Sequence, residues 1–296
     1  MTLPRVVGPR AEDGLDWIAL TDAIVAGHAL PQAEMRDSFA TRGADTILTR
    51  TALIDGMGSL VKAATVFPGN TNAPAINGGV MVFSDRDGTL EAVLDFHLVT
   101  KWKTAASSLL AARRLAPPRV SQILIVGAGT VAASMIAAYR AQFADVPIEI
   151  WNRTPDRARQ LAGPGVHIVT DLHAAVARAD IICTATMAKA PIIKGDWLRP
   201  GQHLDLIGAF RAGMREVDDT ALTRARLFAD ATPSALHIGE ISDPIARGVI
   251  TEADILADFY DLPAFTRAPD DITIAKNAGG AHLDLMTARY ILGCAA

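Results

Sequence analysis

Apolar and polar residues follow different patterns in successive parts of the chain. Before residue 96, short apolar runs separated by turn-forming residues predict strands at residues 47–54, 58–67, 78–84 and 89–95, after a helix at 21–29. Residues 85–88, Asp-Arg-Asp-Gly, lie between the last two strands and predict a hairpin turn. Successive strands joined by such turns indicate an antiparallel sheet.

From residue 104 onward, helices and strands alternate. An alanine- and leucine-rich helix is predicted at 104–115 and ends before two prolines. Strands follow at 122–126, 148–151, 167–169, 180–183, 202–207 and 226–229, and helices at 131–143, 155–161, 172–178 and 251–257. Apolar strands that alternate with helices predict a parallel sheet with helices on both faces.

The end of the chain has a strand at 271–275 and a helix at 282–291. Because this helix follows the last unit of the parallel sheet, we expect it to pack on the N-terminal segment. The expected fold class is α/β: a doubly wound Rossmann sheet at residues 116–271 and a discontinuous α+β domain of residues 1–115 and 272–296.

Composition excludes several classes of protein. The 296 residues are half hydrophobic and carry a net charge of -4, whereas a nucleic-acid binder would usually show a basic excess. Cys183 and Cys294 lie far apart, so neither a disulfide framework nor a metal site is expected, and a reducing cytoplasm is the default. No signal peptide or membrane span is expected, since no apolar run approaches the roughly 20 residues that cross a bilayer.

A glycine-rich turn follows the first strand of the predicted parallel sheet, and its pattern G-x-G-x-x-A is typical of dinucleotide binding. The first glycine permits the tight turn, the second lets the backbone approach a pyrophosphate, and the alanine lets the helix pack closely. The helix N-terminus offers N–H groups to phosphates. The cofactor-binding residues predicted here are Gly127, Ala128, Gly129, Thr130, Val131 and Ala132. A glycine turn in another kind of α/β unit is the alternative.

The end of the second strand predicts which nucleotide binds. An NAD site usually has Asp or Glu there for the ribose hydroxyls, but this chain has Asn152, Arg153 and Thr154, with Arg157 one turn later. A guanidinium can pair with a 2′-phosphate, which a carboxylate would repel. We therefore expect NADPH, with NADH possible; the alternative is that both arginines are simply solvated.

Two further strand ends complete the predicted cofactor site, because ligands bind at the carboxyl ends of parallel strands. Thr184, Ala185 and Thr186 follow the fourth strand and should border the diphosphate and the nicotinamide ribose, although helix capping is an alternative role for the threonines. Gly208 and Phe210 follow the fifth strand and should approach the nicotinamide.

Seven separated segments resemble the ornithine cyclodeaminase/μ-crystallin family in order and spacing. They are Val-Lys at 61–62, Phe-Pro-Gly-Asn at 67–70, Lys-Thr-Ala-Ala at 103–106, the glycine turn, Asn-Arg-Thr at 152–154, Gly-Ala-Phe-Arg at 208–211 with Met-Arg-Glu-Val-Asp at 214–218, and Lys-Asn-Ala-Gly-Gly at 276–280. The resemblance covers nearly the whole chain. It implies a Rossmann domain, a substrate and dimerisation domain built from both termini, a homodimer, and Thr104 among the cofactor contacts.

One departure from the family pattern separates its subfamilies. Cyclodeaminases have a catalytic aspartate in a Gly-x-Asp segment where this chain has Phe210, and phenylalanine cannot activate water or relay protons. The local sequence resembles instead the bacterial Δ1-pyrroline-2-carboxylate reductases, which reduce a cyclic imino acid to L-proline and in some cases its six-membered analogue to L-pipecolate. The expected function is therefore NAD(P)H-dependent reduction of a small cyclic ketimine acid.

The resemblance also implies that Arg50, Lys62 and Lys103 bind the substrate carboxylate, Arg50 with a bidentate contact. Lys62 lies among apolar residues of its strand, so burial should lower its pKa, and we expect it to donate a proton to the ring nitrogen. Lys103 should begin a helix, where a cation opposes the macrodipole, which favours a functional role. Each could instead be a solvated cation, and His282 and Asp284 either line the pocket or are structural.

Three other functions stay open at this point. An ornithine cyclodeaminase would release ammonia, and an alanine-type amino-acid dehydrogenase would require it. A non-catalytic NADP-binding protein of the μ-crystallin type would carry the same cofactor motif.

Overall fold

The computed structural model describes residues 3–295, which divide into two compact units. Unit 1 comprises Met1–Lys103 and Gly280–Ala296, and unit 2 comprises Thr104–Gly279. Unit 1 is thus assembled from both ends of the chain. No helix within residues 3–295 combines the length and the apolar character that crossing a membrane requires.

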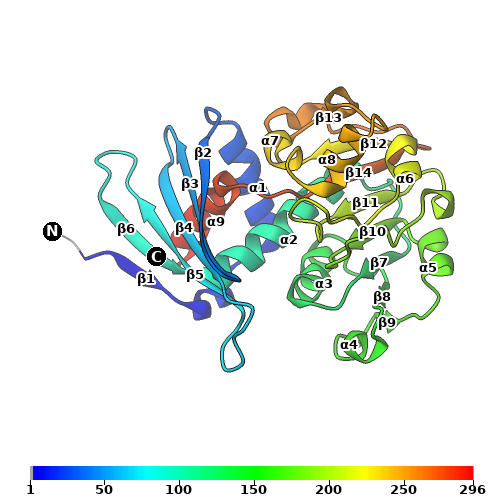
Figure 1. The fold of residues 1–296 in the computed structure, drawn as a ribbon, viewed down its shortest axis with the longest axis horizontal. Coiled ribbons are helices and arrows are strands. Elements are labelled where there is room, and N and C mark those ends of the chain that lie inside the picture. The colour runs from blue at the N-terminus through cyan, green and yellow to red at the C-terminus, as the bar shows by residue number, and fades with distance from the viewer. Residues whose placement is uncertain (1–2, 296) are drawn as a thin grey trace. The chain divides into compact units, whose positions relative to one another are not determined.

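Unit 1 is a sheet with helices on one face (Figure 1). Its strands run in the order β1-β6-β5-β4-β3-β2, antiparallel from β2 to β6, with β1 parallel to β6. The strands are β1 (Arg5–Val7), β2 (Glu34–Arg42), β3 (Asp45–Ile54), β4 (Gly58–Val66), β5 (Ile76–Phe83) and β6 (Leu90–Asp95). The other elements are η1 (Pro9–Gly14), α1 (Trp17–His28), the first part of α2 (Phe96–Leu115), and α9 (Ala281–Cys294).

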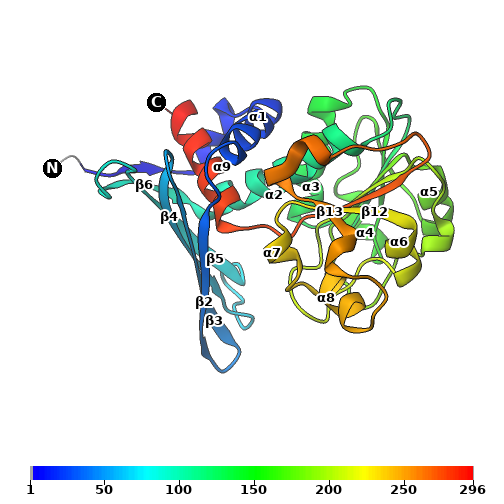
Figure 2. The ribbon, with the colours of Figure 1, turned by 90° about the horizontal axis from the view of Figure 1, so that it is seen from above.

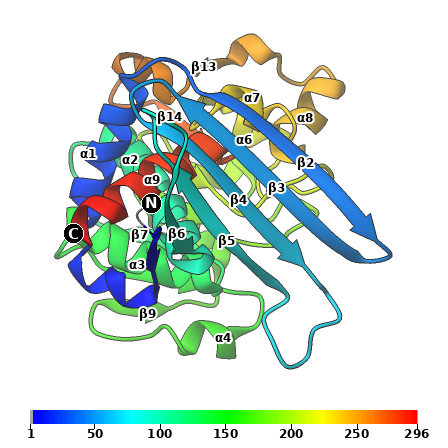
Figure 3. The same ribbon diagram turned by 90° about the vertical axis from the view of Figure 1, so that its left-hand side faces the viewer.

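Alternate side chains of these strands point to opposite faces of the sheet. One inner row consists of Ala52, Leu60, Val82 and Ala92, which pair in register and are at most 2% exposed. Helix α9 packs on this inner face and α1 packs on α9. Figures 2 and 3 show no described helix of unit 1 on the outer face.

Several elements of unit 1 differ from the predictions. Strands β1 and β2 were not predicted, because β2 is a polar edge strand without apolar alternation. Helix α1 begins at Trp17 rather than at residue 21, since Asp16 caps it by accepting a hydrogen bond from the N–H of Ala19. Helix α2 begins at Phe96, where Asp95 caps it through the N–H of Leu98. The expectation that Lys103 begins a helix is therefore wrong.

Unit 2 is a parallel sheet in the order β13-β12-β14-β11-β10-β7-β8-β9, with helices on both faces (Figure 1). Its strands are β7 (Ile123–Val126), β8 (Ile148–Trp151), β9 (Val166–Ile168), β10 (Ile181–Thr184), β11 (His203–Leu206), β12 (Ala225–Ala229), β13 (Ile255–Ala257) and β14 (Ile272–Lys276). Its helices are the rest of α2, α3 (Thr130–Gln142), α4 (Pro155–Arg159), α5 (Leu172–Arg178), α6 (Asp219–Arg224), α7 (Thr232–Ala235) and α8 (Gly239–Ala246), with η2 (Gly195–Trp197), η3 (Glu252–Asp254) and η4 (Phe259–Ala264).

The strand order of unit 2 confirms the predicted doubly wound Rossmann sheet. The chain proceeds from β7 outward through β8 and β9, then returns to β10 on the other side of β7. The carboxyl ends of β7 and β10 therefore mark the topological switch point, where such sheets bind ligands. The strands β7, β10 and β11 are fully buried, which explains the apolar runs of β7 and β10, whereas β11 carries the buried polar residues His203 and Asp205.

Two predictions for unit 2 need correction. The helix predicted at 251–257 is one 3-10 turn, η3, followed by β13, because Ile255–Ala257 pairs with the edge of β12. The strand predicted at 271–275 is confirmed as β14, but it lies between β11 and β12 in unit 2 rather than in the discontinuous domain. The boundaries between the two units therefore lie at 103/104 and 279/280, not at 115/116 and 271/272.

Candidate active site

Two cations lie side by side on the inner face of the unit 1 sheet. Arg50 on β3 and Lys62 on β4 are direct cross-strand partners, an arrangement that is destabilising for like charges unless a counter-charge is present. Asp284 on α9 provides that counter-charge: its Oδ1 accepts a hydrogen bond from Lys62 Nζ at 2.8 Å. Lys62 is 5% exposed and Asp284 is fully buried.

The same carboxylate attracts a third cation. Lys103 on α2 is buried, and its Nζ lies 3.9 Å from Asp284 Oδ1. Thr100, one turn earlier on α2, accepts a second hydrogen bond from Lys62 Nζ at 2.8 Å. The structure thus brings together all three cations that the sequence predicted, around a carboxylate whose function the sequence left open.

These contacts set the protonation of the cluster. Burial lowers the pKa of Lys62 to about 8, against the attraction of Asp284 and with the added repulsion of Lys103 and Arg50. Burial alone would raise the pKa of Asp284, but Lys103, Lys62 and Arg50 together lower it, so this carboxylate is ionised. Lys62 can therefore both hold and release a proton close to neutral pH.

The guanidinium of Arg50 has a carboxylate partner of its own. Asp37, directly opposite Arg50 on β2, accepts from Arg50 Nε at 3.0 and 3.1 Å and from Nη2 at 2.8 Å. One edge of the planar guanidinium is thus bound within unit 1. Sequence reasoning missed Asp37 because the strand that carries it was not predicted.

His282 lies in the same unit, but its pKa is shifted far from neutral pH. Burial, followed by the charges of His28 and Lys103, lowers the pKa of His282 to about 3. Its Nδ1 lies 3.0 Å from the sulfur of Met35. His282 is therefore neutral at physiological pH and does not serve as an acid there.

In unit 2, the glycine turn has the geometry that a dinucleotide requires. Gly127 has a φ of 123°, and a Cβ there would stand 2.4 Å from the carbonyl oxygen of Ala185. Gly129 is the N-cap of α3, and apart from its own neighbours in the chain no described atom lies within 4 Å of where its Cβ would stand. Ala132 is fully buried against the sheet. The first N–H groups of α3, from Thr130 onward, are thus open to a diphosphate, and this turn fits the expected cofactor.

The end of β8 carries the residues predicted to choose between nucleotides. Asn152 donates from Nδ2 to the carbonyl of Thr154 at 2.8 Å, which closes the turn before α4. Arg153 and Arg157 are exposed, and neither forms an ion pair within the described part of the chain. Arg159 by contrast pairs with Asp156.

The strand ends after β10 and β11 meet at a buried carboxylate. Thr184 and Thr186 donate their hydroxyls to Glu216 at 2.7 Å, and Gly208 donates its N–H at 2.6 Å. The alternative that the threonines cap helices is therefore wrong. Phe210 is 53% exposed, in the loop that follows β11. Sequence reasoning had identified Glu216 only as part of a family segment, without a role.

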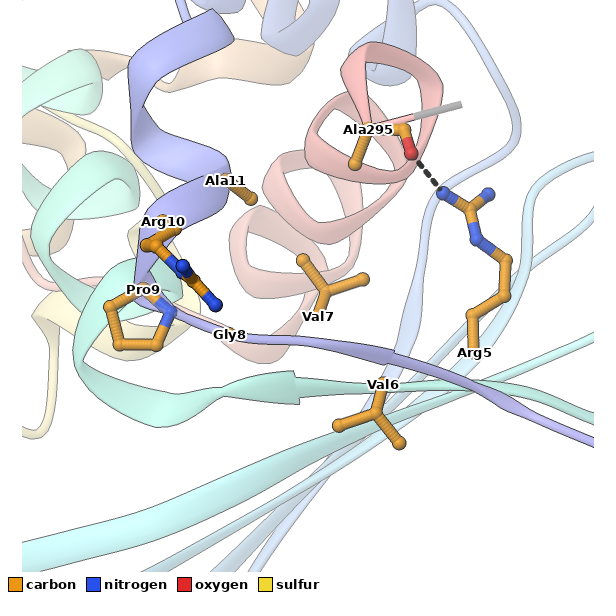
Figure 4. A pocket seen from close by; sticks show the side chains of 8 residues that line it. All are labelled: Arg5, Val6, Val7, Gly8, Pro9, Arg10, Ala11 and Ala295. Carbon is orange, nitrogen blue, oxygen red and sulfur yellow. Dashed lines mark hydrogen bonds between the residues drawn. The ribbon is translucent and has the colours of Figure 1, made fainter.

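A cavity of about 510 Å³ elsewhere in unit 1 lies beside β1 and η1 (Figure 4). Arg5 on its wall donates to the carbonyl of Ala295 at 2.7 Å and so caps the end of α9. Its other lining residues include Val6, Val7 and Pro9, and none of the eight is a carboxylate or a nucleophile. The candidate functional residues are therefore the cation cluster within unit 1 and, separately, the nucleotide-binding turn within unit 2.

Comparison with known proteins agrees with this description. The family model of the ornithine cyclodeaminase/mu-crystallin family matches residues 48–294. The chain is 47% identical to the Δ1-pyrroline-2-carboxylate reductase of Paracoccus denitrificans, over 94% of this chain and 92% of that protein. It is 33% identical to the ketimine reductase mu-crystallin of Mus musculus, over 78% of this chain and 74% of that protein.

Among solved structures, the fold is similar to that of Thermococcus litoralis Δ1-pyrroline-2-carboxylate reductase in complex with NADH and L-proline. The TM-score is 0.90, with 98% of this chain and 97% of that chain covered and 21% sequence identity. At that identity the similarity concerns the fold. Together with the family match and the 47% identity, it leads to one conclusion: the chain belongs to the ornithine cyclodeaminase/mu-crystallin family.

Proposed function

We propose that this protein is an NAD(P)H-dependent oxidoreductase that reduces a cyclic ketimine acid, with Δ1-pyrroline-2-carboxylate as substrate and L-proline as product. The observation that carries the proposal is the buried Lys62–Asp284 pair flanked by Arg50 and Lys103. The 47% identity to a reductase of this name supports the choice of substrate. Phe210 disfavours cyclodeaminase activity, because its side chain has no group that could activate water.

The substrate has a C=N bond beside a carboxylate, and each cation suits one part of it. Lys103 and Arg50 bind the carboxylate through charge-assisted hydrogen bonds. Lys62 donates its proton to the ring nitrogen, which makes the adjacent carbon electrophilic. Asp284 keeps Lys62 protonated and directed by its hydrogen bond.

The bound nicotinamide supplies the hydride that this carbon accepts. Residues of the glycine turn, from Gly127 to Ala132, would hold the diphosphate of the cofactor. NADPH is our proposed cofactor, because Arg153 and Arg157 are exposed and unpaired with any described carboxylate, and Asn152 stands where NAD sites usually have an acid. Thr104 is the further cofactor contact that the family resemblance implies.

We also propose a homodimer formed through the outer face of the unit 1 sheet. Val61, Met81 and Val93 form one row across this face, continued by Val6, which is 83% exposed. Leu53, 52% exposed, lies in the next row. An apolar sheet face of this kind suits a second copy, because a two-fold axis buries the same rows twice. Replacing Met81 and Leu53 by glutamate should give monomers in light scattering, whereas an unchanged dimer would refute this interface.

The experiment that tests the activity is NADPH oxidation with pyrroline-2-carboxylate and piperideine-2-carboxylate side by side, with formation of L-proline or L-pipecolate measured directly. We expect turnover without added ammonia and no ammonia release from L-ornithine. Turnover that requires ammonia would favour an amino-acid dehydrogenase. Failure with every cyclic imino acid, while NADPH binds, would favour a non-catalytic binding protein.

The role of Lys62 has a matched control on a neighbouring helix. Lys62→Met keeps most of the side-chain volume but removes the proton, so we expect loss of most turnover while NADPH still binds. Lys101→Met removes a lysine of α2 whose only assigned partner in the described chain is Glu12, and turnover should persist. Normal turnover in Lys62→Met would remove Lys62 from the mechanism.

A further inference from the structure

A single buried carboxylate in unit 2 accepts hydrogen bonds from residues at the ends of two neighbouring strands. Glu216 lies between β11 and α6 and is fully buried. Within the described chain five hydrogen bonds end on its two oxygens. The donors are the hydroxyl of Thr184, the N–H and hydroxyl of Thr186, and the N–H groups of Gly208 and Ala209, at 2.6–3.4 Å.

These donors belong to two different loops at one edge of the sheet. Thr184 ends β10 and Thr186 follows it, while Gly208 and Ala209 follow β11. The two strands are parallel neighbours, so their carboxyl ends open on the same side as the glycine turn after β7. Glu216 accordingly replaces the hydrogen bonds that each loop would otherwise need from water or from the other loop.

The close approach depends on glycine at two positions. A Cβ on Gly208 would stand 2.4 Å from Glu216 Oε1 and 2.1 Å from the carbonyl oxygen of Thr186. A Cβ on Gly127 would stand 2.4 Å from the carbonyl oxygen of Ala185. The loop of residues 184–186 is therefore packed between Gly127 and Gly208, and its hydrogen bonds to Glu216 fix its position.

Glu216 is in turn held in place by a second buried carboxylate. The N–H of Glu216 donates to Glu240 at 2.7 Å and that of Val217 donates to Glu240 at 3.1 Å. Lys276 is buried nearby and donates to the carbonyl of Leu206, the last residue of β11, at 2.8 Å. Burial lowers the pKa of Lys276, while Glu216, Glu240 and Asp230 act to raise it. Burial raises the pKa of Glu240 to about 7, and the attraction between this group and Lys276 acts against the cost of burying their charges beneath the loops.

We infer that Glu216 is a positioning residue for the nicotinamide half of the cofactor: it fixes the loops at 184–186 and 208–209 without touching the cofactor itself. The inference rests on the proposed binding of a pyridine nucleotide at the glycine turn. It gives a physical role to the glutamate of the Met-Arg-Glu-Val-Asp segment. A carboxylate is needed because an amide has only one oxygen to accept and would turn its NH₂ group toward N–H donors.

The test separates the two halves of the nucleotide. Wild-type protein and Glu216→Gln are titrated calorimetrically with NADPH and with 2′-phospho-ADP-ribose, which lacks the nicotinamide. We expect Glu216→Gln to bind 2′-phospho-ADP-ribose within about twofold of wild type, but NADPH at least about tenfold more weakly, as loss of charge-assisted hydrogen bonds implies. Turnover should fall by about 100-fold, the scale of an ångström-sized misplacement.

Asp180→Asn is the matched control. Asp180 also accepts several hydrogen bonds, from the N–H and hydroxyl of Ser121 at 2.7 Å and the N–H of Gln122 at 3.3 Å, but at the amino ends of β7 and β10. We expect this variant to lower thermal stability and to leave both nucleotide affinities unchanged. Equal weakening of both ligands in Glu216→Gln, or no weakening of either, would overturn the inference.

A milder variant keeps the inference falsifiable if Glu216→Gln does not fold. Thr184→Val keeps the shape of a fully buried side chain and removes one donor to Glu216. It should weaken NADPH selectively as well, by about threefold, since it removes one hydrogen bond to a charged group. Unchanged NADPH affinity in this variant would count against the inference. If wild-type protein binds neither ligand, the proposed function fails first, and the role of Glu216 falls with it.

Discussion

The Asp284→Asn variant isolates the one interaction that keeps Lys62 charged. Asparagine fills nearly the same volume but removes the negative charge 2.8 Å from Lys62 Nζ and 3.9 Å from Lys103 Nζ. With Asp284 in place, the pKa of Lys62 is about 8. Loss of an adjacent opposite charge shifts a pKa by about 1–3 units, so the pKa of Lys62 should fall to about 6.

The consequence for turnover follows from the protonated fraction. At about pH 7.5 a lysine of pKa about 8 is roughly three-quarters protonated, whereas one of pKa about 6 is only about 3% protonated. If Lys62 is the proton donor, kcat at that pH should drop by about 25-fold, and the alkaline limb of the kcat profile should move about two units toward acid. Activity should recover relative to wild type as the pH is lowered to about 6.

The assay is kcat for pyrroline-2-carboxylate with saturating NADPH between about pH 5.5 and 9.5, with NADPH affinity and thermal unfolding measured on the same samples. Breaking a buried ion pair costs about 3–5 kcal/mol of folding free energy, so stability must be followed. Asp95→Ala serves as the control, because it removes the cap of α2 at a cost of about 1 kcal/mol without touching Lys62. A folded Asp284→Asn protein whose alkaline limb stays in place would refute this reasoning.

Three further predictions follow from the same geometry. The pKa of His282 is lowered to about 3 in the folded protein, against 6.5 ordinarily, so the unfolded state binds more protons between these pH values. The free energy of unfolding should therefore fall as the pH drops from about 6.5. In His282→Gln this fall, measured by urea unfolding at about pH 4, should be smaller by a few kcal/mol. Gly129 has an ordinary φ of -94° and space for a Cβ, so Gly129→Ala should leave the melting temperature of the free protein unchanged and abolish NADPH binding. Gly127 has a φ of 123°, so Gly127→Ala should also lower the melting temperature. Equal melting temperatures of the two variants would contradict this. Arg157→Ala should raise the KM for NADPH about tenfold or more and leave the KM for NADH unchanged. Arg159→Ala is the control and should change neither KM, because the Arg159 guanidinium pairs with Asp156. An equal effect of Arg157→Ala on both nucleotides would refute the preference for NADPH.

Local sequence patterns were sufficient to predict much of the fold of the nucleotide-binding unit. The glycine turn, the strand before it and the helix after it are contiguous in sequence, and the structure has them where the spacing predicts. Glu216 could not be assigned in this way. Its partners lie at or just after strand ends, 7 to 32 residues away, and only the assembled sheet brings them to one carboxylate.

The cation cluster could be predicted only in part. Arg50 and Lys62 were identified through the family resemblance, but their pairing required the register of β3 and β4. Asp37 was missed because an exposed edge strand carries no apolar alternation. Lys103 was expected at a helix start, whereas Asp95 begins α2 earlier and so places Lys103 well inside the helix.

The connection of β14 and α9 to the rest of the protein constrains how the nascent chain can mature. The acidic partner of Lys62 lies 222 residues further along the chain, and β14 enters the middle of its sheet from the same late segment. Neither unit can therefore acquire its complete core until β14 and α9 have been synthesised, and contacts of such sequence separation form slowly. A ribosome that stalls before residue 272 would release a polypeptide with an open sheet and an unneutralised lysine.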